Sequence, residues 1–234
     1  MRYLTTTRRR AHLAALTTLF FSASSTPAVA QFGLRGGMNL SKFVGSSAGN
    51  SESATGLNVG ASISLIHLGP VSIVPEVYYS QKGARQFDPG ALAAGSAAAP
   101  TTLDFGLDYI EVPVLVKASF PLARLLHGYV AGGPAYAWNI DCSISVTGSG
   151  ATTNTSNCNQ TFGSVKTAMQ KADRGIVAGA GLDFNAFGLG GLNLDARVVR
   201  GLTRLTTSTA GTTGADLKNQ SVSLMLGYYI GVGR

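Results

Sequence analysis

The sequence predicts an all-β protein, an eight-stranded antiparallel up-and-down barrel that crosses a membrane with its strands. Three observations lead to this prediction: apolar residues recur at every second position in eight segments, the connections between these segments alternate in length, and charge is scarce. Of the 234 residues, 45% are hydrophobic and only 12% are charged, whereas about a quarter of the residues in an ordinary soluble domain are charged. No run of about 18 apolar residues is present, which excludes a transmembrane helix.

The first 30 residues have the features of a secretory signal peptide. Arg2 and the arginines at 8–10 precede an apolar stretch at 13–21, and Ala28-Val29-Ala30 supplies small residues for cleavage. Cleavage leaves residues 31–234 as a single domain. It also removes four of the 18 basic side chains, so the net charge falls from +7 to about +3. The basic charge therefore gives no support to a nucleic-acid partner.

The first four segments are expected strands because each has an apolar face and a small or polar face. Segment 32–41 alternates Phe, Leu and Met with Gly, Arg and Asn, and segment 57–65 alternates Leu, Val and Ile with Asn, Gly and Ser. Segment 71–82 follows a turn at 67–70 and places Val, Ile and Tyr opposite Ser, Glu and Lys. Segment 109–117 places Ile and three valines opposite Tyr, Glu, Pro, Leu and Lys.

Four further segments complete the set, and eight is an even number, as is usual in bacterial barrels. Segment 129–139 is rich in glycine, so the direction of its faces is left open. Segment 175–184 places Ile, Ala, Leu and Phe opposite Gly, Val and Asp, and segment 192–199 places Leu, Ala and Val opposite Asn, Asp and Arg. Segment 221–230 alternates Val, Leu, Tyr and Ile with Ser, Met and Gly.

The seven connections alternate between long and short, with about 10, 4, 20, 8, 31, 7 and 15 residues in chain order. The long ones are rich in Ser, Thr, Ala, Gly and Asn. Barrels of the outer membrane have tight turns at the periplasmic end and long loops outside. We therefore expect both termini in the periplasm and four outer loops.

The polar faces decide between a membrane barrel and a soluble lipocalin-like barrel, which would turn its apolar face inward. They are rich in Gly, Ser and Asn and hold four charges of each sign, which suits a narrow lumen filled by side chains better than a surface in water. The predicted lumenal charge network comprises Arg35, Glu76, Lys82, Glu111, Lys117, Asp183, Asp195 and Arg197. Predicted interfacial aromatic residues are Phe32, Phe184 and Tyr228 on the periplasmic side and Tyr79, Tyr136 and Trp138 on the outer side.

Several segments also resemble the PorT-like outer-membrane β-barrel family, often called the porin-family or outer-membrane protein β-barrel domain. The matching segments cover essentially all of residues 31–234 and include 33–41, 75–83, 108–117, 132–134, 179–182, 194–197 with 201–202, and 224–228. The resemblance implies an outer-membrane barrel from a Gram-negative, Bacteroidetes-like organism, in a family mostly without assigned biochemical roles. The C-terminus departs from it, because such barrels tend to end on an aromatic residue and this chain ends on Arg234.

A barrel in this location would meet outer-membrane lipid and lipopolysaccharide, and the barrel-assembly machinery during biogenesis. We expect a structural or cell-surface interaction role with a plugged lumen, and a small-solute channel is the alternative. Cys142 and Cys158 are expected to form a disulfide in the longest loop rather than a redox pair. The scattered histidines argue against a lipid-modifying enzyme, because a nucleophile needs an oriented base beside it, and no metal or cofactor is expected.

Overall fold

The computed structural model describes residues 30–49, 51–87, 102–147, 153–157, 170–187, 190–205 and 216–232. The predicted signal peptide and much of the predicted long loops therefore lie outside the described residues. These residues form ten β-strands: β1 (Ala30–Val44), β2 (Glu52–Ser64), β3 (Ile66–Leu68), β4 (Val71–Phe87), β5 (Thr102–Ala123), β6 (Leu126–Thr147), β7 (Thr153–Asn157), β8 (Ala172–Phe187), β9 (Gly190–Gly201) and β10 (Lys218–Val232). Within them, no helix is long and apolar enough to span a membrane.

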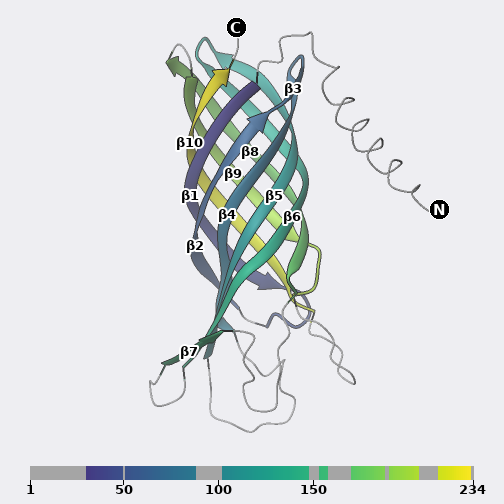
Figure 1. Cartoon of the computed structure of the whole chain (residues 1–234), viewed down its shortest axis with the longest axis vertical. Helices are drawn as coiled ribbons and strands as arrows, with labels where there is room; N and C mark the ends of the chain where they lie inside the picture. Colours follow the sequence, from purple (N-terminus) through teal and green to yellow (C-terminus); the bar gives the residue numbers. More distant parts are fainter. Residues whose placement is uncertain are drawn as a thin grey trace, which may run out of the picture.

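Eight of the strands form a closed antiparallel barrel (Figure 1). β1 pairs with both β2 and β10, the chain continues around the wall through β9, β8, β6, β5 and β4, and β4 pairs back with β2. β3 follows β2 after a single residue and pairs with β4, while β7 pairs with β6. The wall therefore has no free edge, and every strand can satisfy its backbone groups from its two neighbours.

The connections divide the barrel into two different ends (Figure 1). The first and last described residues, Ala30 and Val232, and the turns at 69–70 and 124–125 lie at one end, called here the short-turn end. The strand ends that the long connections join, and β7, lie at the other, called the long-loop end. Gly69 has φ of +63° in the turn before β4, a conformation that glycine adopts without strain. The predicted alternation of long and short connections is therefore present.

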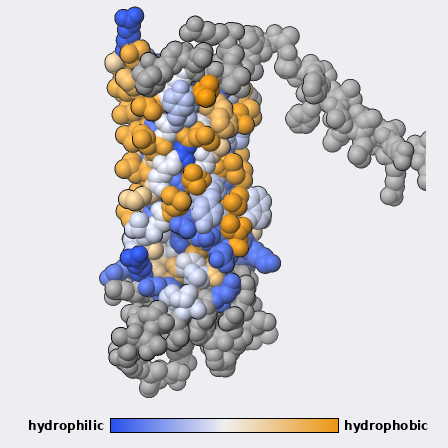
Figure 2. Space-filling model, turned by 60° about the vertical axis from the view of Figure 1, so that its left-hand side comes forward, coloured by the Kyte–Doolittle hydropathy of each residue, from blue (hydrophilic) through white to orange (hydrophobic). Residues whose placement is uncertain are grey.

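The period-two pattern correctly identified the faces of the strands. Side chains of β9 alternate between buried and exposed along the whole strand, and β10 alternates in the same way from Leu217 to Tyr228. Exposed large hydrophobic side chains such as Met38, Leu224 and Leu226 point away from the lumen. In Figure 2 they cover the middle and upper wall, and hydrophilic side chains collect toward the long-loop end.

The strand limits and two connections differ from the prediction. β5 runs to Ala123 and β6 starts at Leu126, so the predicted eight-residue connection at 120–127 is shortened to two residues. β6 continues to Thr147 and β7 pairs with its outer part, so the predicted 31-residue loop begins with more strand. The glycine-rich β6 also acquires a defined inner face, on which Tyr129, Ala135 and Ala137 are buried.

Candidate functional site

Four of the predicted lumenal charges meet near the middle of the barrel as one ionic cluster. Arg35 Nη1 on β1 lies 2.5 Å from Glu76 Oε1 on β4, and Arg197 Nη1 on β9 lies 2.6 Å from the other carboxylate oxygen of Glu76. Arg197 also donates through Nε and Nη2 to both oxygens of Asp195, at 2.6 and 2.9 Å. Their side chains are at most 8% exposed. Two positive and two negative groups thus cancel in the lumen.

The other four predicted charges form two separate pairs, one on each side of this cluster along the barrel. Lys82 Nζ on β4 lies 2.6 Å from Glu111 Oε1 on β5, toward the long-loop end. Lys117 Nζ on β5 lies 2.6 Å from Asp183 Oδ2 on β8, toward the short-turn end. The structure therefore places all eight predicted residues in the lumen and brings each to an oppositely charged partner. Such pairing offsets the high cost of an isolated charge in a dry interior.

Two tyrosines that were not predicted as site residues complete the polar network. Tyr129 donates from its hydroxyl to Asp195 Oδ2 at 2.6 Å, and Lys117 Nζ lies 3.9 Å from the centre of the same ring. Tyr78 accepts a hydrogen bond from Arg35 at 3.2 Å and presents its ring to Arg197. Tyr78 shares the inner face of β4 with Glu76 and Lys82, and this shared period was the signal available in the sequence. Tyr129 lies on β6, a strand without any predicted charge, so the sequence offered no such signal for it.

Glycines on the adjacent strands, each the direct cross-strand partner of a large inner side chain, make room for it. A Cβ atom on Gly60 would lie 2.4 Å from the Tyr78 ring, and one on Gly181 would lie 2.3 Å from the Tyr129 hydroxyl. A Cβ atom on Gly227 would lie 2.6 Å from Arg35 Cγ. The lumen therefore alternates very small and very large residues, the arrangement by which small barrels fill their interior.

An apolar layer fills the barrel at the long-loop end. The rings of Phe43 on β1 and Phe105 on β5 meet edge to face with centroids 5.6 Å apart, and Leu107 and Tyr109 on β5 are each 1% exposed. The cluster continues with Ala48, Ala84, Ala137, Cys142, Ile144, Leu205 and Leu217. This layer, called here the apolar plug, lies in series with the charged pairs, so water would have to cross both.

A polar cavity of about 410 Å³ opens at the short-turn end and is called here the vestibule. Its wall includes Ser62, Ser72, Lys117 and Asp183, and Arg35 of the ionic cluster also lines it. His127 lies in the vestibule, with Nδ1 3.3 Å from Asn185 Nδ2. The vestibule is therefore open to solvent on one side and bounded by the ionic cluster.

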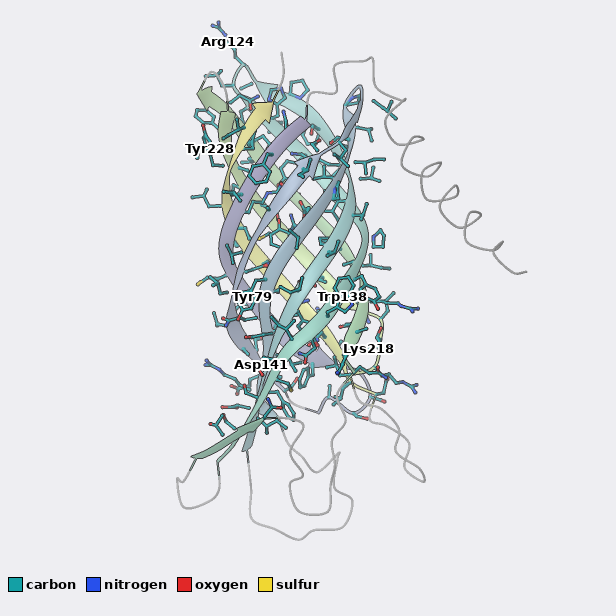
Figure 3. All side chains as sticks on the ribbon, in the orientation of Figure 1. Tyr79, Arg124, Trp138, Asp141, Lys218 and Tyr228 are labelled. Atoms are coloured by element: carbon teal, nitrogen blue, oxygen red, sulfur yellow. The ribbon has the colours of Figure 1, made fainter. Side chains whose placement is uncertain are left out.

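The six predicted interfacial aromatic residues lie near the two ends of the apolar wall. Phe32, Phe184 and Tyr228 are about 40% exposed near the short-turn end. Tyr136 and Trp138 pack edge to face with centroids 4.5 Å apart, and Tyr79 donates to Asp108 at 2.6 Å, all toward the long-loop end. Tyr228 thus lies far above Tyr79 and Trp138 in Figure 3, on either side of the hydrophobic region.

The cysteines and histidines form no chemical centre within the described residues. No group of three or more His, Cys, Asp or Glu side chains there could hold a metal ion. Cys142 is buried on β6, and Cys158 lies outside the described residues, so their pairing stays a prediction. β3 contains His67, far along the sequence from His127.

Comparisons with known proteins found one family match and several solved structures of low sequence identity. A family model described as outer membrane protein beta-barrel domain matches residues 22–207. Among solved structures, Neisserial surface protein A is 13% identical, with 86% of this chain and 97% of that chain covered and a TM-score of 0.46. OprG from Pseudomonas aeruginosa is 11% identical (89% and 98% covered, TM-score 0.48), and the outer membrane protease OmpT from Escherichia coli is 9% identical (91% and 99%, 0.40). A comparison with curated proteins returned no match.

Proposed function

Because the chain belongs to the outer membrane protein β-barrel domain family, we propose that it is a closed, non-conducting barrel that presents its long loops at the cell surface. The family implies the outer membrane as its location. In this proposal the short-turn end and both termini face the periplasm, after removal of the signal peptide. The narrower PorT-like kinship also belongs to the proposal and is supported by the ordered motifs along the chain.

One observation carries the proposal: the lumen is blocked twice along its axis. The ionic cluster around Glu76 joins charged side chains of β1, β4 and β9 across the lumen. The apolar plug around Leu107 then fills the next level toward the long-loop end. An ion crossing the barrel would have to break buried salt bridges and then lose its water among apolar side chains, and each step is costly.

Small-solute passage is the competing function, and the vestibule is the observation that favours it. Its 410 Å³ would hold a small solute at the periplasmic end, but continuing the path requires movement of Arg35 and the plug. We propose no catalytic role. Catalysis by a nucleophile needs an oriented base within hydrogen-bond distance of it, and among the described hydrogen bonds His127 contacts only the Asn185 amide.

Single-channel recording in planar bilayers tests the closed barrel. We expect no steady conductance from the unmodified protein, and none when Phe105 and Leu107 of the plug are both replaced by Ala, because the ionic cluster still blocks the lumen. Steady conductance of the unmodified protein that disappears in Glu111→Ala or Lys117→Ala would contradict the closed lumen, because those pairs would then line a working path. The shift in gel mobility between unheated and boiled samples verifies that each variant is folded.

The orientation has its own test. An epitope inserted after Gly49, at the long-loop end, should bind antibody on intact cells. The same epitope inserted after Gly69, at the short-turn end, should bind antibody only after the outer membrane is permeabilised. The reverse result would place the long loops in the periplasm.

The disulfide is also part of this proposal. β7 pairs with β6 up to Ser143 and Asn157, and the next residues along the chain from that pair are Cys142 and Cys158. A bridge there would fasten the β6–β7 hairpin at its base. By the chain-entropy account it would stabilise the fold by roughly 3 kcal/mol.

A further inference from the structure

The outer wall changes abruptly from apolar to basic on one side of the barrel, near the long-loop end. Leu40, Val222 and Val198 are successive cross-strand partners on β1, β10 and β9, and all three are exposed hydrophobic residues. The next outward-facing row in the same register is Lys42, Gln220 and Arg200. On β8 the change occurs between Ile176 and Arg174. The change therefore follows the register across β1, β10 and β9, and on β8 it comes one outward-facing position later, because Ile176 is the partner of Arg200.

Four exposed cations lie beyond this boundary, and they are called here the basic arc: Lys42, Lys171, Arg174 and Arg200. Among the described residues, none of the four forms a salt bridge. Arg200 is the cross-strand partner of Ile176, and the backbone N–H of Leu202 bonds to the carbonyl of Arg174. Arg174 and Arg200 therefore occupy diagonal outward-facing positions on the adjacent strands β8 and β9, from which two long side chains can reach one multivalent anion.

Two further cations at this rim share one carboxylate, that of Asp216. Arg204 Nε lies 3.3 Å and Lys218 Nζ 3.9 Å from Asp216 Oδ1. Desolvation raises the pKa of Asp216, but a hydrogen bond involving Ser46 and the charges of Lys218 and Arg204 outweigh it and hold the pKa below its usual range. Asp216 is therefore ionised at neutral pH and offsets one of these two positive charges, while the four cations of the basic arc have no such partner among the described residues.

The next two strands around the barrel, β6 and β5, carry acidic residues at the same rim. Asp104 and Asp108 on β5 and Asp141 on β6 lie beyond the apolar wall, and Asp108 and Asp141 are cross-strand partners. In Figure 3 Asp141 and Lys218 lie on opposite sides of the barrel at similar height. The arc is thus a localised positive surface at the depth where lipid headgroups begin, next to the Tyr136 and Trp138 girdle.

We infer that the basic arc binds the phosphate groups of lipid headgroups in the membrane leaflet on the long-loop side. On the side of the arc that faces the middle of the barrel, the outward-facing residues of β1, β10 and β9 are apolar. A bound lipid would place its acyl chains on Leu40, Val222 and Val198 while its phosphates meet the cations. Arg is suited to this task because its planar fork binds phosphate oxygens in pairs. The inference rests on the proposed function, in which this leaflet is the outer one and its phosphorylated lipid is built on lipid A.

The test measures binding of diphosphorylated lipid A to the purified full-length barrel in neutral detergent micelles by native mass spectrometry. The double variant Arg174→Gln/Arg200→Gln is compared with the matched double variant Arg85→Gln/Arg124→Gln, which removes two exposed arginines elsewhere on the barrel. Each basic side chain near an anionic lipid surface is worth about a factor of five in binding. We therefore expect roughly thirtyfold weaker binding for the arc variant and at most a twofold change for the control.

Three results would overturn the inference. They are equal losses in the two double variants, equal binding of dephosphorylated lipid A, and displacement of lipid A by an equimolar amount of inorganic phosphate, which would indicate a site for free anions instead of lipid. Heat-modifiable migration of both variants verifies that they are folded. Because micelles have no inner and outer leaflet, a wrong orientation in cells would be detected by the epitope test and not by this one.

Discussion

Glu76 is the residue on which the closed lumen depends most, and replacing it with Gln tests the ionic cluster directly. The substitution keeps the size of the side chain and removes its charge. In the native cluster the Glu76 carboxylate accepts hydrogen bonds from Arg35 Nη1 at 2.5 Å and from Arg197 Nη1 at 2.6 Å, and the Glu76 side chain is 1% exposed. After the change, two guanidinium groups share the cluster with Asp195 alone, so the lumen gains one uncompensated positive charge.

The expected cost follows from these contacts. A hydrogen bond to a charged group contributes about 1.5–3 kcal/mol, and the Gln side chain retains one acceptor in place of the two that Glu76 uses. Removing one partner of a buried ion pair costs about 3–5 kcal/mol, because the other charge is left buried without a partner. We therefore expect Glu76→Gln to lower the free energy of unfolding by about 3 kcal/mol.

Urea unfolding in lipid bilayers, followed by the fluorescence of Trp138, measures this change, because Trp138 is the single tryptophan of the chain. The control is Glu52→Gln on β2, an exposed carboxylate without a described salt bridge, for which we expect a change of about 0.5 kcal/mol or less. If Glu76→Gln and Glu52→Gln destabilise equally, the ionic cluster does not hold the lumen together.

A double-mutant cycle separates the charge imbalance from the lost contacts. Arg35→Gln combined with Glu76→Gln restores neutrality, so we expect the double variant to lose less stability than the sum of the single variants, by at least about 1 kcal/mol. The same Arg35→Gln combined with Glu52→Gln should be additive. Additivity in both cycles would show that Arg35 and Glu76 act independently.

Three further predictions address the wall and the loops. Leu224→Arg places a charge on the exposed apolar face and should cost about 2–4 kcal/mol in bilayers, whereas Gln220→Arg on the same strand should cost about 1 kcal/mol or less; equal costs in bilayer unfolding would contradict a lipid-facing wall. Gly37→Val should prevent the heat-modifiable form on gels, because a Cβ atom there would lie 2.0 Å from the Leu224 carbonyl oxygen, while Gly36→Ala, with no atom nearer than 3.9 Å, should fold. Maleimide labelling without reductant should find no reactive thiol on the folded protein, and two labelled cysteines would refute the disulfide.

The faces of the strands were predictable from the sequence because burial in a barrel follows the same period of two as the side chains. The strand ends were not, because β5 and β6 keep pairing beyond the apolar pattern, as at Ser143 and Thr147. The charged residues could be assigned to the lumen, but their partners could not. Arg197 and Glu76 are 121 residues apart, and only the closure of the barrel brings β9 opposite β4.

The tyrosines of the network show a second limit. Tyr78 and Tyr79 are adjacent in the sequence, and the pattern correctly separates an inner from an outer ring. Nothing in the pattern predicts that Tyr129 hydrogen-bonds with Asp195, because that contact also depends on Gly181 leaving space for the phenol. How side chains fill the lumen depends on which strands are adjacent or opposite in the closed barrel. A single sequence does not state which strands these are.

The pairing of β1 with β10 has a consequence for the order of biogenesis. All fifteen residues of the first strand, from Ala30 to Val44, pair with all fifteen residues of the last, from Lys218 to Val232. A chain that has not yet delivered β10 has two unpaired edges, which hydrocarbon does not tolerate. Closure of the barrel must therefore wait for β10, and in the proposed location the chain has to be kept unfolded in the periplasm until that strand has been exported.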